Sequence, residues 1–131
     1  MVARTKQRGF TIIELMIVMS IIVILLGIAI PNYRQSIVRA RESVLKDDLF
    51  TMRSVIDQYT LDKQKAPQSL DDLVAAGYLK TIPKDPMTNT TEWTVQQEDS
   101  LMAVDQQEPG IVDVHSTSSA SSSEGTPYSE W

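Results

Sequence analysis

The sequence predicts an α+β protein in which one long N-terminal helix packs on a small antiparallel β-sheet. Three observations predict this fold class. An apolar run opens the helix, apolar residues then recur at helical spacing, and short β-like runs separated by polar turns follow. The 131 residues leave about 100 outside the apolar run, which is enough for one small domain but not for two.

The apolar run extends from Phe10 to Ile30, and Glu14 is its only residue with a charged side chain. Its 21 residues match the roughly 20 that an α-helix needs to cross a bilayer. A plain membrane anchor or an uncleaved signal sequence would explain this length, but neither explains Glu14 or the glycine before Phe10. Three cations and no acid precede the run, so the positive-inside rule places the amino end in the cytoplasm and residues 32–131 outside it. These cations are Arg4, Lys6 and Arg8.

The stretch Gly9–Glu14 (GFTIIE) resembles the processing site of class III signal peptides, which occur in type IV pilins and type II secretion pseudopilins. The resemblance implies that a prepilin peptidase cuts after Gly9 and methylates the new amino terminus of Phe10. Unlike the apolar region of an ordinary secretory signal, the helix is then retained. The implied regions are a cleaved leader at 1–9, a transmembrane and filament-core helix at 10–31, and an exterior pilin-like globular domain at 32–131 with a serine-rich C-terminal loop.

Glu14 is expected to act in assembly. Cleavage would create an ammonium group at Phe10, about one helical turn from the carboxylate of Glu14. An unpaired buried carboxylate costs several kcal/mol, so packing helices would favour the register in which the amino terminus of the same or a neighbouring subunit neutralises Glu14. The resemblance implies the same use, because similar family members employ the equivalent glutamate in this way.

One continuous helix is expected from about Phe10 to Leu61. Pro31 follows the apolar run, and because a helical pattern resumes after it, we expect a kink or a freed carbonyl rather than a helix end. Six later residues with spacings of 7, 4, 3, 4 and 3 form one apolar face, expected to pack on the domain core. A coiled-coil seam is the alternative use, but only about three heptads are present. The six are Val38, Leu45, Leu49, Met52, Ile56 and Tyr59.

A short second helix is expected at Leu70–Ala76, because Ser69 and Asp72 have capping-box spacing and Gly77 suits a helix stop. Pro83–Pro86 then predicts a rigid loop. Three β-like runs joined by polar turns predict an antiparallel meander laid on the apolar face of the long helix. The runs are Glu92–Gln96, Leu101–Asp105 and Ile111–His115.

The C-terminal segment combines a serine-rich stretch with an aromatic end. Residues 116–123 contain six serines, a composition typical of a flexible linker or surface loop. Tyr128 and Trp131 follow, and two aromatic residues after a polar stretch indicate that this end is anchored on the domain. We therefore expect an ordered loop with an anchored end.

Charge is distributed unevenly. The net charge is −5, and removing three leader cations makes it −8, while residues 85–131 carry nine acids and no base. This balance argues against nucleic-acid binding, and the absence of cysteine excludes disulfides and thiol chemistry. The acidic block is a solvated face, an electrostatic partner for a basic surface, or a source of cation ligands. In a filament it could contact basic residues of another subunit, namely Arg34, Arg39, Arg41 and Arg53.

Three C-terminal features resemble the major pseudopilin, the G subunit, of type II secretion systems: Leu79–Pro86, Gly110–Ser116 and Trp131. The lack of cysteine also fits, because many type IV pilins close a C-terminal loop with a disulfide. The resemblance implies a structural subunit that polymerises through its N-terminal helix into a pseudopilus and helps export folded proteins. A subunit of an extracellular type IV pilus is the alternative, followed by a non-polymerising, membrane-anchored binding domain.

The resemblance also implies a cellular location and a set of partners for the protein. It implies a single-pass protein of the bacterial inner membrane whose C-terminal domain is outside the cytoplasm, periplasmic or extracellular, and which enters a filament after assembly. The implied partners are copies of itself, minor pseudopilins, the prepilin peptidase, and an inner-membrane assembly platform with a cytoplasmic ATPase. No sequence feature identifies the secreted substrate.

The resemblance further implies a calcium ion bound in the loop after the segment that ends at Ser116. Calcium prefers several carboxylate oxygens, whereas this region is rich in hydroxyls, which are weak calcium ligands. No cofactor is therefore expected from the residues alone. Asp113, Ser116 and Glu124 are the candidate ligands if calcium binds.

Enzyme activity is not expected. His115 is the only histidine and has no cysteine partner, so a nucleophile and base would have to be assembled from scattered serines. The adjacent pairs Asp47–Asp48 and Asp71–Asp72 lie in predicted helices, where neighbouring residues do not face each other. They are poor acid–base pairs.

Overall fold

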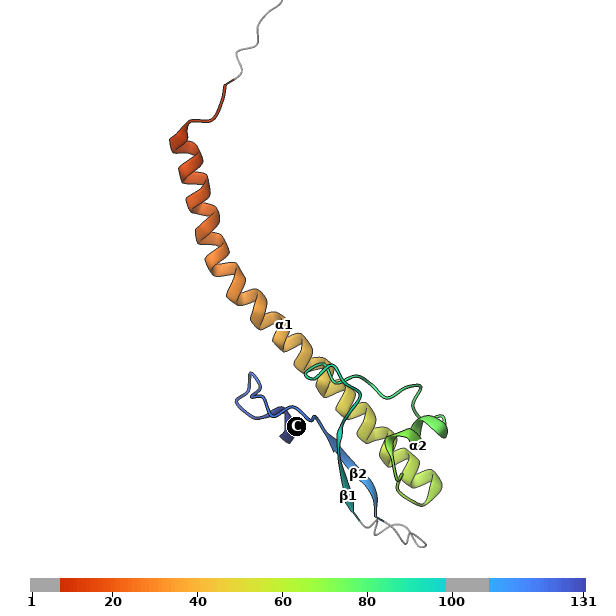
Figure 1. Cartoon of the computed structure of the whole chain (residues 1–131). Coiled ribbons are helices and arrows are strands. Elements are labelled where there is room, and N and C mark those ends of the chain that lie inside the picture. Colours follow the sequence, from red (N-terminus) through yellow and green to blue (C-terminus); the bar gives the residue numbers. More distant parts are fainter. Residues whose placement is uncertain (1–7, 99–108) are drawn as a thin grey trace, which may run out of the picture. The chain divides into compact units, whose positions relative to one another are not determined.

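The computed structural model describes residues 8–98 and 109–131, which form two helices, a two-stranded sheet and a short 3-10 helix (Figure 1). The chain divides into two compact units, Met1–Ile37 and Val38–Trp131, and α1 contributes to both. In chain order the elements are α1 (Ile12–Lys63), α2 (Leu70–Ala75), β1 (Thr94–Glu98), β2 (Gly110–His115) and η1 (Tyr128–Glu130).

In the first unit, α1 presents apolar side chains over its whole circumference. The large apolar residues from Ile12 to Ile30 are 43 to 81% exposed. One 18-residue window has a mean hydropathy of 2.9 and no buried residue, so this stretch is long and apolar enough to cross a membrane. The helix begins two residues after the expected Phe10 and continues through Pro31, as the resuming helical pattern predicted.

In the second unit, α1 contributes one buried face to the core. Five of the six expected residues are buried here, Leu45, Leu49, Met52, Ile56 and Tyr59. The expectation for Val38 was wrong, since its side chain is 42% exposed. Glu42 is instead the first buried residue of α1, because the C-terminal segment reaches the helix there and not one turn earlier.

The short helix α2 has the capping interactions that its sequence predicted. The carboxylate of Asp72 accepts the backbone N–H groups of Ser69 at 3.0 Å and Gln68 at 2.9 Å. At the other end Gly77 adopts φ +83°, and the N–H groups of Gly77 and Tyr78 donate to the carbonyls of Val74 and Leu73. This is a Schellman stop, in which a left-handed glycine satisfies the last free carbonyls.

The sheet pairs β1 with β2 directly and antiparallel, from Thr94 opposite His115 to Glu98 opposite Gly110. The expected meander order was therefore wrong, because the first and third strands of a meander run parallel and are separated by the second. The expected middle run, Leu101–Asp105, lies outside the described residues. A bulge between Gln96 and Gln97 shifts the register within this pair.

The core lies between α1, α2 and β2 and is closed by the C-terminal segment. Ile111 and Val114 of β2 are buried, whereas every residue of β1 is exposed. The serine-rich segment is ordered, and Tyr128 of η1 is only 4% exposed, which confirms the anchored end. The buried cluster comprises Leu45, Leu49, Met52, Ile56, Tyr59, Leu73, Trp93, Ile111, Val114 and Tyr128.

Candidate functional site

The expected processing junction lies on an exposed, non-helical stretch just before α1. Residues 8–11 are exposed, and the side chain of Phe10 is 91% exposed. A Cβ atom built at Gly9 would meet nothing within 4 Å, and Gly9 does not adopt a left-handed conformation. The folded structure therefore does not require glycine at position 9. An exposed, non-helical junction is accessible to a peptidase.

Glu14 forms a reciprocal cap with Thr11 at the start of α1. Its Oε2 atom accepts the backbone N–H of Thr11 at 3.0 Å, and its own N–H donates to Oγ1 of Thr11 at 3.2 Å. This is a capping box, which satisfies two of the donors left free at a helix N-terminus. The Thr-x-x-Glu spacing that predicts it was overlooked in the sequence. Glu14 therefore has a local structural use before any cleavage.

The three candidate calcium ligands each have a different protein partner. Asp113 accepts a hydrogen bond from Nε of Arg53 at 2.5 Å, and Glu124 accepts one from Nζ of Lys46 at 2.8 Å. Ser116 is fully buried and donates its hydroxyl to Asp85. Within residues 8–98 and 109–131, no hydrogen bond joins one candidate ligand to another, and no group of three acidic or histidine side chains is placed to hold a metal.

Glu42, a buried carboxylate that was not predicted from the sequence, joins the C-terminal segment to α1 through hydrogen bonds. Its side chain is 5% exposed and accepts the backbone N–H of Ser123 at 2.7 Å, the hydroxyl of Ser123, and the hydroxyl of Tyr128 at 2.8 Å. Burial alone would raise the pKa of Glu42, but these hydrogen bonds and the charge of Lys46 outweigh it and lower the pKa. The only signal available was that Glu42 falls on the same helical face as Leu45 and Leu49.

Arg53 also joins α1 to the C-terminal end of the chain through hydrogen bonds. Its Nη2 atom donates to the main-chain oxygens of Val114 at 2.9 Å and Trp131 at 2.6 Å, while Nε binds Asp113. Arg53 was expected to be available to acids of another subunit, but these internal partners occupy it. A guanidinium suits such a position because its fork of donors can bind several acceptors at once.

His115 and the paired carboxylates have ordinary surroundings. His115 lies between the main-chain oxygen of Trp131 at 2.6 Å and Asp113 at 3.4 Å, and in the described part of the chain no hydroxyl is hydrogen-bonded to it. Burial and the neighbouring charges of Asp47 and Asp85 raise the pKa of Asp48. Neither arrangement supplies an activated nucleophile.

The comparison with known proteins finds a motif that spans the start of α1. The prokaryotic N-terminal methylation motif matches residues 4–30. The type IV major fimbrial protein FimA of Dichelobacter nodosus is 45% identical over 65 residues, which cover 50% of this chain and 41% of that protein. Together with a long N-terminal helix on a small antiparallel sheet, these matches define a protein of the type IV pilin-like class.

Within that class, longer similarity is found to a secretion-system component. Core protein G of the type II secretion system of Escherichia coli (strain K12) is 33% identical over 103 residues, covering 66% of this chain and 71% of the relative. The protein of the same name from Pseudomonas aeruginosa is 32% identical over 106 residues, covering 69% and 75%. The chain therefore belongs to the family of type II secretion system core protein G. No solved structure matches it.

Proposed function

We propose that this chain is a structural subunit that polymerises through its N-terminal helix into the pseudopilus of a type II secretion system and helps export folded proteins. The single observation that carries the proposal is the apolar stretch of α1, which is exposed on every side and continuous with a helix that also forms part of a folded domain. Such a surface must be covered, first by lipid and then by the same stretch of neighbouring subunits.

Processing precedes assembly in this proposal. A prepilin peptidase binds the exposed junction, cuts after Gly9 on the cytoplasmic side, and methylates the amino group of Phe10. The leader cations and the apolar stretch support this orientation, with the C-terminal domain outside the cytoplasm and the anchor in the bacterial inner membrane. Glycine before the cut is then a requirement of the peptidase, since the fold does not need it.

Glu14 then selects the helix register in the filament. A charge within a membrane segment costs about 2.5–3.5 kcal/mol on insertion scales, so a docking position that supplies a cation is favoured over others. In the uncleaved chain the backbone N–H of Thr11 donates one hydrogen bond to this carboxylate. Cleavage adds the amino terminus of Phe10 as a charged partner, in the same subunit or in the next one.

The proposed partners follow from this route. They are further copies of this chain, minor pseudopilins, the prepilin peptidase, and an inner-membrane assembly platform driven by a cytoplasmic ATPase. The similarity to secretion core proteins from several bacteria supports this setting. The similarity to the fimbrial protein FimA favours a second candidate, a subunit of an extracellular type IV pilus.

The test is an accurate mass for the N-terminal peptide, taken from sheared surface material and from washed membranes. We expect a peptide that begins with N-methylated Phe10, mainly in the membrane fraction, as a short secretion pseudopilus would give. The same peptide found mainly in the sheared fraction would favour a type IV pilus. An intact leader in both fractions would remove the filament proposal.

A further inference from the structure

A hollow with a volume of about 530 Å³ lies on one face of α1 in the first unit. Its lining residues form two neighbouring rows with four positions between successive members, so they share one side of the helix. All of them are exposed, and they are Ala29, Ile30, Tyr33, Arg34 and Ile37. We call this hollow the Arg34 site and define it by these five residues.

The Arg34 site begins where the apolar stretch of α1 ends. From Ile12 to Ile30 the helix is about 27 Å long at 1.5 Å per residue, close to the roughly 30 Å hydrocarbon core of a bilayer. With this stretch in the membrane, Ile30 lies at the edge of the hydrocarbon. Tyr33 and Arg34 lie about 5 Å further along the helix axis, at the level of the lipid headgroups. A tyrosine is common at this depth, because its ring contacts acyl chains while its hydroxyl reaches polar groups.

Arg34 has no counter-ion in the part of the chain that the structure describes. Its side chain is exposed, and no carboxylate of residues 8–98 and 109–131 forms an ion pair with it. The sequence contains no acid between Glu14 and Glu42. In the proposed orientation Arg34 lies outside the cytoplasm, so the positive-inside rule, which accounts for the leader cations, does not account for it. An arginine at this position therefore indicates an anionic partner outside the chain.

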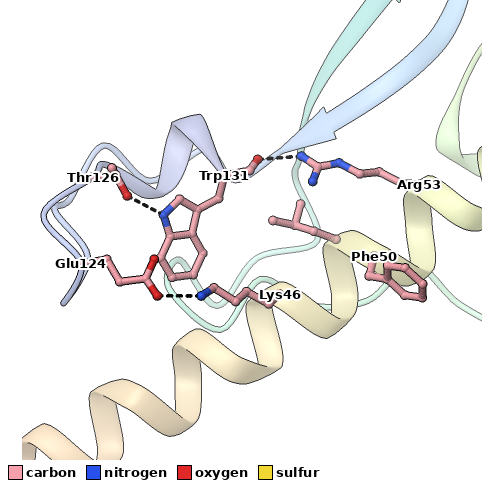
Figure 2. Close-up of a pocket in the computed structure, with 7 residues that line it drawn as sticks. Lys46, Phe50, Arg53, Glu124, Thr126 and Trp131 are labelled. Carbon is pink, nitrogen blue, oxygen red and sulfur yellow. Dashed lines mark hydrogen bonds and ion pairs between the residues drawn. The ribbon is translucent and has the colours of Figure 1, made fainter.

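The hollow between α1 and the C-terminal segment in the second unit is different in this respect. Figure 2 shows Lys46 facing Glu124, to which its Nζ atom donates at 2.8 Å. It also shows Arg53, whose Nη2 atom donates to the main-chain oxygen of Trp131 at 2.6 Å. Both cations of that hollow have partners within the chain, so it needs no external anion.

We propose that the Arg34 site binds an anionic phospholipid of the membrane leaflet outside the cytoplasm. The proposal rests on the membrane insertion in the proposed function and adds a partner to it. The guanidinium of Arg34 binds the lipid phosphate through its fork of donors, and the hydroxyl of Tyr33 donates to the same group. Ala29 and Ile30 contact the acyl chains. An anionic lipid is favoured because its phosphate has no cation of its own, whereas the phosphate of a zwitterionic lipid lies beside an ammonium group.

Photo-crosslinking within the site tests the proposal. The full chain with benzoylphenylalanine in place of Ile30 is reconstituted in vesicles of equal amounts of phosphatidylglycerol and phosphatidylcholine, and the adducts are identified by mass after irradiation. We expect about fivefold more adduct with phosphatidylglycerol, as one cation near an anionic lipid gives, and about equal amounts when Arg34→Gln is added. Lys63→Gln is the matched control, because it removes the same charge from an exposed position at the other end of α1, and it should keep the fivefold preference.

Folding should not differ among these chains. Arg34 and Lys63 are both exposed, so in detergent each glutamine variant should unfold within about 1 °C of the unmodified chain. Equal amounts of the two adducts before any change at Arg34 would overturn the proposal, and so would a preference for phosphatidylglycerol that persists in Arg34→Gln. Arg34→Gln that lowers the yield of filaments without changing the adduct ratio would also overturn it, since Arg34 would then pair with another subunit.

The mass of the N-terminal peptide tests the proposed function separately. If Phe10 is methylated but the Arg34 site shows no lipid preference, only the lipid assignment fails. If the leader stays intact while the preference for phosphatidylglycerol depends on Arg34, the filament proposal fails and the lipid site remains. If the chain does not insert into vesicles at all, both proposals fail.

Discussion

Two glutamates of α1, Glu14 and Glu42, show how differently one residue type is used in this chain. Glu14 lies near the start of an apolar stretch, and within residues 8–98 and 109–131 its hydrogen-bond partner outside the helix backbone is Thr11. Glu42 is buried in the folded domain and bonds to Ser123 and Tyr128, about eighty residues away in sequence. The first stood out in the sequence because it interrupts an apolar run, whereas the second is surrounded by other charged residues and gave no such signal.

Replacing Glu14 should separate processing from assembly. Glu14→Gln keeps the size and one acceptor oxygen, so α1 should still form and the peptidase should still cut after Gly9. Without a negative charge, the amino terminus of Phe10 loses its partner, and we expect few or no filaments in electron micrographs of sheared material. Processed Glu14→Gln that assembles like the unmodified chain would show that the carboxylate is not needed.

Replacing Glu42 should weaken the domain itself. Glu42→Ala leaves the N–H of Ser123 and the buried hydroxyl of Tyr128 without this acceptor, so we expect a loss of about 2–4 kcal/mol in the free energy of unfolding. Urea unfolding of the full chain in detergent measures it. Ser54→Ala, an exposed change on the same helix, is the control and should cost at most about 0.5 kcal/mol. Equal effects of the two variants would contradict this role of Glu42.

Because folding lowers the pKa of Glu42, the stability that this residue contributes depends on pH. Because the pKa is depressed on folding, its contribution is complete above the ordinary value of 4.5 and is lost as the pH falls through the lower folded value. The raised pKa of Asp48 acts in the opposite direction, since deprotonation of Asp48 weakens the folded state as the pH rises. The difference between the unmodified chain and Glu42→Gln therefore isolates Glu42, and it should shrink below pH 4.5.

At the scale of elements, short-range signals predicted α2 well. Its cap at Ser69 and Asp72 and its stop at Gly77 depend on residues within a few positions of one another. Gly77→Ala should cost about 1–2 kcal/mol, because φ +83° brings a Cβ atom too close to the following carbonyl. Gly77→Asn should cost less, since asparagine tolerates this region better. Thermal unfolding in detergent ranks the three chains, and an alanine variant as stable as the glycine chain would contradict the Schellman stop.

We expect the C-terminal segment to keep its folded conformation without calcium. Asp113 and Glu124 already form ion pairs with Arg53 and Lys46, and Ser116 is buried against Asp85. We therefore expect the same unfolding temperature with millimolar calcium and with a chelator. A bound ion at 100 times its Kd would add about 2.7 kcal/mol of stability, so a clear rise with calcium that the chelator reverses would show that a site exists.

At the scale of the whole molecule, the chain consists of an apolar anchor and a domain with its own core. Residues 38–131 form one compact unit, and every residue of the buried cluster belongs to it. We expect a fragment of residues 38–131 to unfold in a single cooperative transition without detergent. A fragment beginning at Ser43 lacks Glu42 and should be less stable by about the 2–4 kcal/mol expected for Glu42→Ala. Absence of a cooperative transition in the longer fragment would contradict this division.

Predictions of the fold failed where distant parts of the chain meet. The long helix, the core face from Leu45 to Tyr59 and the cap of α2 follow from periodicity and local spacing. Val38 has the same periodicity, but within residues 8–98 and 109–131 no segment covers it, and its side chain stays exposed. The strand order was wrong because alternation of side chains identifies a strand but not its partner, and β1 pairs with β2 across eleven intervening residues.

The sequence by itself determined the apolar stretch that is long enough to cross a membrane and the N-terminal methylation motif, because each depends on residue types at short, fixed spacing between Arg4 and Ile30. Tertiary structure alone decided which side chains join α1 to the C-terminal segment. The bonds of Glu42 to Ser123 and of Arg53 to Trp131 join residues 81 and 78 positions apart. Contacts at such separation depend on how the whole chain packs and leave no local pattern, so only the folded molecule reveals them.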